Sequence, residues 1–410
     1  IKGLASGNFK GAISDIADYV SSFQITMQAI QQAKQGFSTF LDYNKDLTNI
    51  SYTMDLSQNQ LQGLGTSAID MAKDLSMSLD NTMDIYKIYA NMNTTASEIQ
   101  QTAKPTAILS NLSGVDASTA ADQVQGILQQ FHMLDDGATT AADASMHIVD
   151  VLDKVSGSVG IDYAKGIKII SDAVQASGQV AYDAGMSYEQ LAAITAKVSE
   201  RTREDGSSIG NALKTIITRT TKVGKMPQYA DEVDNATLSN ASASLHAVGV
   251  DVYNPDGSDR GIITVMSELK DKWNDLSDAQ QAKIAFDVAA TRQTSKFKSM
   301  LDAFTDSMTL AEEATTANGN AEANQEKYME STAGKLQAIK TQMQEFWVNF
   351  YNSGTVNGVL DFVQGLTEGF TNLEKTLGPI PALITAVFAA MTVKNAALTG
   401  LKFLSGDGLT

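Results

Sequence analysis

The sequence contains no cysteine, and only 5 of its 410 residues are proline. Without cysteine there is no disulfide framework, no thiolate metal site and no cysteine nucleophile, so buried apolar surface must stabilise the fold. The scarcity of proline leaves long stretches free of helix breakers. We therefore predict an all-α fold, an elongated array of amphipathic helices.

Basic residues are also few, because 30 Lys and Arg stand against 47 Asp and Glu, for a net charge of −17. Binding to nucleic acid draws on clustered Lys and Arg, which occur here only as scattered singles and pairs. Specific nucleic-acid binding is therefore not expected as the main activity. With 43% hydrophobic residues the chain can bury a sizeable core, and its length predicts more than one domain or one elongated array.

Residues 1–55 carry two heptad patterns, and the apolar seam rotates around the helix near Gly36. We predict one or two helices that lie on their own domain, with a coiled coil for self-association as the alternative. The chain begins at Ile1 without a basic and apolar leader, and we expect it to be a piece of a longer chain.

Residues 56–225 are predicted to form an α-helical array, because helix-start signals recur along them. In a capping box, a Ser or Thr side chain accepts from the backbone amide three residues on, and the Glu or Gln there reaches back. Asp116 or Ser118 and the helix Asp143–Val155 add to the same pattern. The pairs in this segment are Ser57 with Gln60, Thr95 with Glu98, and Ser187 with Gln190. A fourth pair, Ser277 with Gln280, lies beyond it.

Residues 226–304 are predicted to hold a β-hairpin over 248–265, followed by helices. Alternating apolar residues flank the turn sequence Asn254-Pro-Asp-Gly257 on both sides, which is typical of a hairpin. A two-stranded ribbon is marginal alone, so we expect it to lie against a helix that carries Met266, Leu269 and Trp273.

The last third of the chain divides into three predicted segments. Residues 305–325 are polar and small, and we expect a linker or a loose helix there. Residues 326–377 show apolar steps of three and four and predict long amphipathic helices, the first of which ends at Asn352-Ser-Gly354. Residues 378–410 begin an apolar region that we expect to continue beyond this chain. Its uncharged run 382–393 is short for a membrane span, and a buried helix is the favoured interpretation.

Several short motifs resemble catalytic or binding signatures, but each lacks its structural context. Gly206-Ser-Ser208-Ile-Gly210 fits a nucleophile elbow, yet no strand leads into it, so the serines are predicted to cap a helix. Asn254-Pro-Asp256-Gly257 lacks the outer ligands of a calcium loop. Gly63-Leu-Gly65 lacks the strand of a dinucleotide fingerprint. We therefore predict no catalytic, cofactor-binding or metal-binding residue. The remaining candidates are His132, His147 and His246, too far apart for a local metal motif, and the adjacent pairs Asp135-Asp136 and Glu312-Glu313, which are expected to be solvated.

The segment 184–219 carries the most specific pattern in the chain. Ala184-Gly-Met-Ser-Tyr-Glu-Gln-Leu-Ala-Ala-Ile194 continues into Glu204-Asp-Gly-Ser-Ser-Ile-Gly-Asn-Ala-Leu-Lys-Thr-Ile-Ile-Thr-Arg219, and Gly249-Val-Asp-Val-Tyr-Asn-Pro-Asp-Gly257 follows. In this order the sequence resembles the tape measure proteins of long-tailed phages and prophages. The likeness covers roughly residues 40–350, and no catalytic residues come with it.

The resemblance implies a structural protein of the virion, with copies that form a homo-oligomer in the lumen of the tail tube. The expected partners are the tail tube protein, tail assembly chaperones and tail tip proteins. The protein would help to set tail length, be made in the host cytoplasm and leave ahead of the DNA at ejection, with contact between 382–401 and the host membrane as a hypothesis.

Two other classes of function compete with this interpretation. A pore-forming or toxin-like helical protein would use the apolar stripe of 359–377 and the segment after it for insertion, and would act alone on membranes. A helical scaffold of other origin would form coiled-coil oligomers without tail proteins. We expect no enzymatic activity in these residues, and an enzyme function survives only as a domain appended outside them.

Overall fold

The computed structural model describes residues 35–36, 38–92, 94–135, 137, 139–229 and 235–353. By its internal contacts the chain divides into two units, one of Ile1–Lys87 with Met329–Thr410 and one of Ile88–Tyr328. The predictions for residues 1–34 and 354–410 lie outside the described residues; these include most of the heptad segment and all of the apolar segment. Within the described part, no helix combines the length and the apolar character that a membrane crossing needs.

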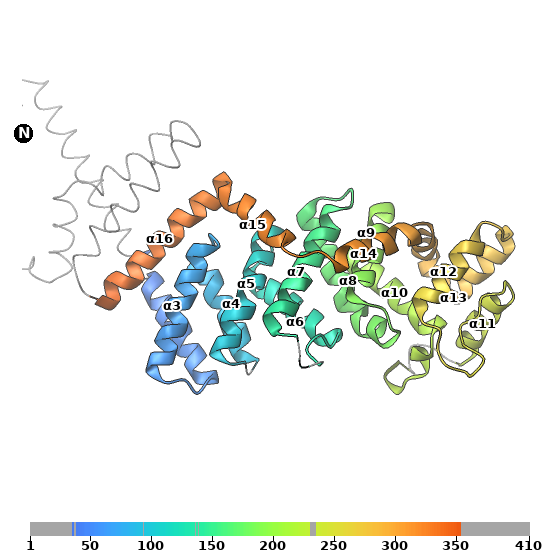
Figure 1. The fold of residues 1–410 in the computed structure, drawn as a ribbon, viewed down its shortest axis with the longest axis horizontal. Helices are drawn as coiled ribbons and strands as arrows, with labels where there is room; N and C mark the ends of the chain where they lie inside the picture. Colours follow the sequence, from blue (N-terminus) through green and yellow to red (C-terminus); the bar gives the residue numbers. More distant parts are fainter. Residues whose placement is uncertain are drawn as a thin grey trace, which may run out of the picture. The chain divides into compact units, whose positions relative to one another are not determined.

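The described part of the first unit consists of helices from before residue 88 and after residue 328. Its helix 38–53 buries Tyr43, Leu47 and Ile50, the second of the two predicted heptad registers, while Leu41 of the first register is 49% exposed. The other helices, drawn in Figure 1, are α3 (Gln58–Asp74), most of α4 (Leu79–Asn91) and α16 (Thr332–Ser353).

Polar contacts tie α16 to the N-terminal helices of this unit. The Thr341 hydroxyl donates to the Met77 carbonyl at 2.5 Å, and Lys73 forms an ion pair with Glu345 at 3.0 Å. The described part of α16 reaches Ser353, and the predicted helix end at Asn352-Ser-Gly354 extends past the described residues. Residues before and after the second unit in sequence therefore pack together in the first unit.

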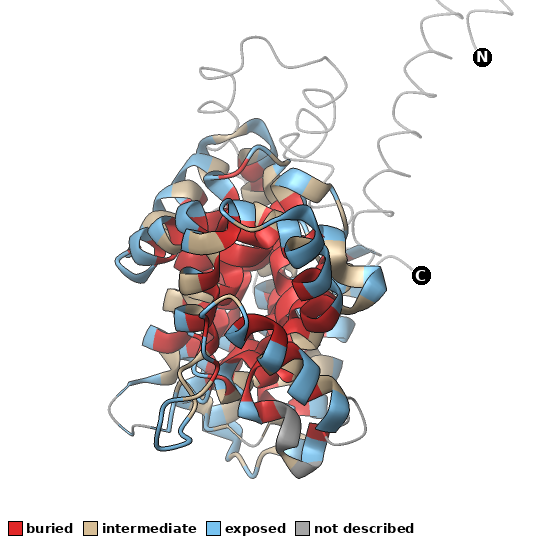
Figure 2. Ribbon diagram, turned by 90° about the vertical axis from the view of Figure 1, so that its right-hand side faces the viewer, coloured by how far each residue is buried: buried red, intermediate tan, exposed pale blue. Residues whose placement is uncertain are grey.

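The second unit is an array of helices whose apolar sides face one another (Figure 1). Helix α8 packs on α10, α9 on α14, α10 on α13, and α5 on α7. Figure 2 shows the buried residues on the facing sides of the helices and the exposed residues on their outer sides. The helices are α5 (Ala96–Ser113), α6 (Ala117–Gln130), α7 (Ala141–Gly157), α8 (Tyr163–Asp183), α9 (Tyr188–Thr202), α10 (Gly206–Thr220), η1 (Lys222–Lys225), η2 (Pro227–Tyr229), α11 (Asn235–His246), α12 (Ile262–Trp273), α13 (Asp278–Asp302), α14 (Phe304–Thr315) and α15 (Asn320–Glu330).

All four predicted capping boxes are present. Ser57, Thr95, Ser187 and Ser277 begin α3, α5, α9 and α13, and each box has both of its reciprocal hydrogen bonds. Asp116 caps α6 by accepting from the Thr119 amide at 2.8 Å. Because capping satisfies backbone amides that have no partner inside the helix, these residues fix where the helices start.

The predicted β-hairpin over 248–265 is wrong. The described residues there contain only an isolated antiparallel bridge between Tyr253 and Asp259. Gly261 has a φ of 76° and precedes the first residue of α12, so the expected second strand is the first turn of that helix. The helical spacing of buried Ile262, Val265 and the apolar residues that follow outweighs a short strand pattern, because a lone ribbon buries little surface.

The segment 305–325, expected to be a linker or a loose helix, is helical apart from a short turn. It forms most of α14 and the first part of α15. Buried Asp150 of α7 accepts from the amides of Gly319 at 3.0 Å and Ala321 at 2.9 Å. A side chain distant in sequence thus caps α15, which the polar composition of the segment could not reveal.

Helix α13 is interrupted at Ala290. This residue has φ 57° and ψ 167°, outside the helical region, so two helical segments, 278–289 and 291–302, meet there. A side chain rarely adopts this backbone conformation because the Cβ crowds the neighbouring carbonyl, and the cost is about 1–3 kcal/mol. The packing of the two segments must therefore offset this strain.

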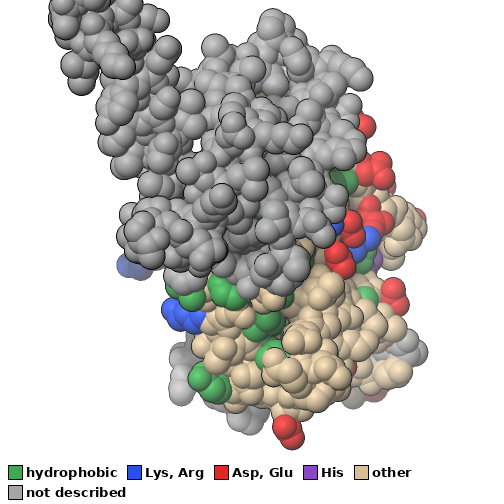
Figure 3. Space-filling model, turned by 90° about the vertical axis from the view of Figure 1, so that its left-hand side faces the viewer, with side chains coloured by type: hydrophobic (Ala, Val, Ile, Leu, Met, Phe, Trp, Pro, Cys, Tyr) green, Lys and Arg blue, Asp and Glu red, His purple; other side chains and the backbone are tan. Residues whose placement is uncertain are grey.

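Acidic side chains crowd parts of the surface, as the net charge predicts. Figure 3 shows Asp and Glu side chains gathered along one edge of the described surface, with basic side chains between them. In the first unit, burial raises the pKa of Asp80, and the nearby carboxylates of Asp42, Asp46 and Asp84 raise it further. Lys87 offsets part of this repulsion through ion pairs with Asp46 at 2.9 Å and Asp84 at 2.7 Å.

We expect Ala290→Gly to stabilise the protein by about 1 kcal/mol, because glycine adopts a positive φ without the Cβ clash. The free energy of urea unfolding measures the change. The matched control is Ala282→Gly, at an exposed position inside the first segment, which should cost about 1 kcal/mol. Equal losses in the free energy of unfolding for Ala290→Gly and Ala282→Gly would contradict the interruption of α13 at Ala290.

Candidate functional site

The segment that carries the family resemblance folds into two helices joined by the α9–α10 turn, residues 203–205. Arg203 lies in the left-handed region with φ 60°, and its amide donates to the Ser199 carbonyl at 2.8 Å. Asp205 then caps α10 by accepting from the Ser208 amide at 2.9 Å. The prediction that the serines of this motif cap the helix is wrong, because the aspartate before them does so.

The two glycines of Gly206-Ser-Ser208-Ile-Gly210 let α10 approach α8 closely. A Cβ on Gly210 would lie 2.6 Å from the Ala173 carbonyl oxygen, and one on Gly206 would collide with the Ile169 carbonyl oxygen. Side chains cannot occupy such positions unless the helices separate. The motif therefore serves helix packing. It begins a helix that follows another helix, without the strand that a nucleophile elbow needs.

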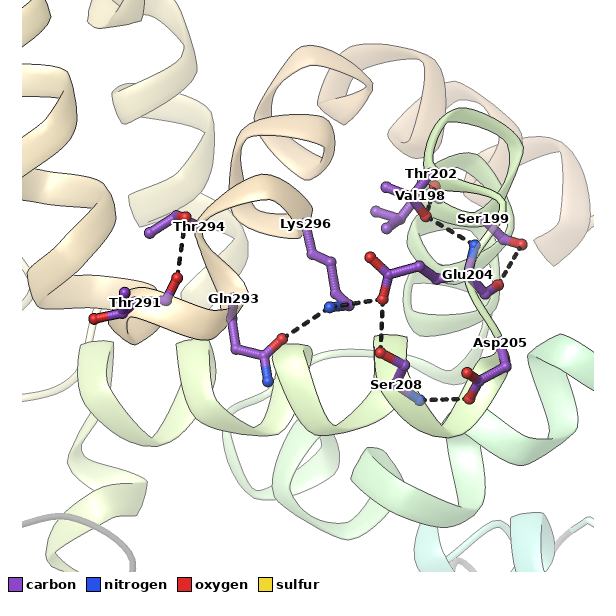
Figure 4. A network of polar contacts seen from close by, with 10 residues as sticks. All are labelled: Val198, Ser199, Thr202, Glu204, Asp205, Ser208, Thr291, Gln293, Thr294 and Lys296. Carbon is purple, nitrogen blue, oxygen red and sulfur yellow. Dashed lines mark hydrogen bonds and ion pairs between the residues drawn. The ribbon is translucent and has the colours of Figure 1, made fainter.

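A polar network joins the α9–α10 turn to α13 (Figure 4). The Lys296 ammonium lies 2.7 Å from Glu204 Oε2 and donates to Gln293 Oε1 at 3.1 Å. Ser208 donates its hydroxyl proton to the same Glu204 oxygen at 2.7 Å. The hydrogen bond from Lys296, and to a lesser extent that from Ser208, lowers the pKa of Glu204, because both stabilise the carboxylate. We call Glu204, Ser208 and Lys296 the turn clamp.

A second network holds the first segment of α13. The Asp287 side chain, 8% exposed, accepts from the Ser244 hydroxyl of α11 and pairs with Lys283 at 2.7 Å. The Asp287 carbonyl lies 3.4 Å from Arg219 Nη1 of α10. These contacts bind α10, α11 and α13 together in the second unit.

The three histidines do not come together. His147 contacts Glu189 at 2.6 Å, His132 contacts Asp135 at 2.8 Å, and His246 contacts Asp251 at 2.6 Å, each as a separate pair. Across the described residues, no group of three or more His, Asp and Glu side chains could hold a metal ion. Each histidine thus has a local carboxylate partner.

The other sequence motifs have structural partners of their own. The loop at Asn254-Pro-Asp256-Gly257 is closed by hydrogen bonds from Ser258 to Asp256, which lower the pKa of that carboxyl group. Gly65 lies inside α3 against Tyr43, so the dinucleotide-like pattern is a helix contact. Glu313 forms an ion pair with Lys154 at 3.0 Å.

Sequence reasoning missed the buried charges of the described residues, among them Asp150, Asp287 and Lys296. No short motif marks them, because each has a partner that is distant in sequence. One signal was available for Lys296, since it occupies a position at helical spacing from Met300 and next to Phe297, both buried. A charged residue at such a position must find a partner inside the fold.

We expect Gly206→Ala and Gly210→Ala each to destabilise the protein by about 1–3 kcal/mol, because the added methyl group would push α10 away from α8. The control is Gly126→Ala in α6, where a Cβ meets nothing within 4 Å. That variant should gain about 0.5–1 kcal/mol through helix propensity. Thermal and urea unfolding measure these differences in stability. Increased stability in all three variants would contradict the close contact of α10 with α8.

The lowered pKa of Glu204 predicts an acid-dependent contribution to stability. Because the folded-state pKa lies below the unfolded one, the contribution is complete above the unfolded pKa and is lost as pH falls through the folded pKa. In urea unfolding between about pH 3 and about pH 7, the free energy of unfolding of Glu204→Gln should therefore fall less on acidification than that of the parent chain. Lys296→Met should show the same reduction, and an unchanged pH dependence in both variants would disprove the role of the turn clamp.

The chain matches a protein-family model but no solved structure. A family model described as phage-related minor tail protein matches residues 65–290, the region that includes α5–α12 and the turn clamp partner Glu204. This match covers more than half of the 410 residues, and the chain therefore belongs to the family of phage-related minor tail proteins.

Proposed function

We propose that this chain is part of a tape measure protein of a long-tailed phage or prophage. In this role, copies of it occupy the lumen of the tail tube, help to set tail length during assembly and leave ahead of the DNA at ejection. The observation that carries the proposal is the match of residues 65–290 to a phage minor tail family, joined to the tape measure-like order of motifs in 184–257.

Two properties of the chain support a place in the DNA path. The net charge of −17 opposes lasting contact with DNA phosphates, so exiting DNA would not be held. The described residues are built from helices that contact one another through apolar faces, without a grouping that could hold a metal ion. We propose that the chain acts by shape and occupancy.

Geometry limits how much tail length this chain could measure. A continuous helix rises about 1.5 Å per residue, so 410 residues could span at most about 600 Å. Within the second unit the helices pack side by side, so this unit is shorter than one continuous helix of the same residues. We infer that the repetitive part of the ruler lies elsewhere in the full protein.

Purified particles provide the first test. Mass spectrometry should find the chain in intact particles together with tube subunits and should no longer find it after DNA release. A chain that is absent from particles and permeabilises lipid vesicles by itself would contradict the proposal and favour the pore-forming alternative.

Tail length provides the second test. We expect an in-frame deletion of residues 88–328 to shorten tails in electron micrographs, by no more than about 360 Å at the helical rise per residue. Particles with the Gly126→Ala variant serve as the control and should keep their tail length. Unchanged tails in the deletion would deny these residues a measuring role while leaving the first test to decide on tail membership.

A further inference from the structure

Nothing in the local sequence of α13 accounts for its interruption. The stretch Asp278–Asp302 contains neither glycine nor proline, and the interrupted position is an alanine, the best helix former. Ala290 nevertheless has a positive φ that residues with a side chain rarely adopt. The strain must therefore be imposed by contacts with other helices.

The phase of the buried residues explains why the helix breaks. In the first segment Ala285 and Ala289 are buried, and in the second segment Phe297 and Leu301 are buried. Residues 285 and 297 are twelve positions apart, and at about 100° per residue a continuous helix would point them about 120° apart. The interruption breaks this phase relation, so that each segment can turn its own apolar face into the core.

Polar contacts stabilise the interrupted form on both sides of Ala290. In a continuous helix the Asp287 carbonyl would accept from the amide of residue 291, whereas here it lies 3.4 Å from Arg219 Nη1. Beyond the interruption, the turn clamp holds Lys296 at 2.7 Å from Glu204, with the lysine side chain only 8% exposed (Figure 4). Both contacts favour the interrupted form over the continuous one.

We propose that α13 is a two-state element, interrupted while segment 291–302 is docked in the core and continuous once that segment leaves it. Undocking removes the strain at Ala290 and frees the Asp287 carbonyl for the amide of residue 291. The continuous helix is about 37 Å long and carries its two apolar faces in different directions. The proposal goes beyond a role in the phage tail and does not depend on it.

Burial decides which state the resting chain adopts. Docking buries Phe297, Met300 and Leu301 to 3% exposure or less, and the burial of three large side chains outweighs strain at one residue. The interrupted form is thus the ground state. The continuous form gains population only when docking is weakened, because an equilibrium shifts by the difference in free energy between its states.

Distance measurements in the full chain test this proposal. Because the sequence has no cysteine, Ala282→Cys and Lys298→Cys, both at exposed positions, place two spin labels uniquely. Docking is weakened by the pair Lys296→Gln and Phe297→Ser. We expect pulsed electron paramagnetic resonance to show a shift from the parent distribution to a narrow component near ~24 Å, the span of sixteen residues in a continuous helix.

Ala290→Gly is the matched control in the undocked chain. Glycine tolerates the interrupted backbone and disfavours a continuous helix, so the component near ~24 Å should shrink in this variant. An undocked chain with the parent distribution would overturn the proposal. A broad distribution with fast amide exchange over 278–302 would also overturn it, because the segment would then melt instead of straightening.

A second measurement covers the case in which the undocked variant no longer unfolds cooperatively. The same label pair is then followed in the parent chain through urea concentrations below the global transition, where local opening releases the second segment. The component near ~24 Å should rise before the global transition. Its absence throughout this range would overturn the proposal.

Discussion

The second unit depends on the close approach of α10 to α8 at Gly206 and Gly210. These positions bring one helix against the backbone carbonyls of the other, at Ile169 and Ala173, where no side chain fits. Because α10 also packs on α13, its position relative to α8 determines where the turn clamp can form. A motif that resembles a catalytic elbow thus acts through the absence of two side chains.

Buried charges position the helices that apolar contacts alone would leave free to slide. Apolar packing is non-directional, whereas a buried carboxylate or ammonium needs its partners at fixed distances. Asp150 determines where α15 begins, Asp287 joins α11 to α13, and Lys296 joins α13 to the α9–α10 turn. Each of these charges lies on one helix and has at least one partner outside it, so together they help to specify the arrangement of the array.

The sequence predicted the features that depend on nearby residues. The four capping boxes are confirmed because their hydrogen bonds span three residues, and the all-α class follows from apolar spacing. The hairpin at 248–265 was wrong because a short alternating run cannot be weighed locally against the packing of α12. The interruption at Ala290 and the turn clamp could not be predicted, since both result from contacts between distant segments.

The hydrogen bonds from Gly319 and Ala321 to Asp150 join residues that are 169 and 171 positions apart. During synthesis, α7 leaves the ribosome long before the backbone that its carboxylate will hold. Until then Asp150 must remain in water or be buried without its partners, at a cost in free energy. The nascent second unit is therefore incomplete until translation has passed α15, which delays its final closure to the end of its own synthesis.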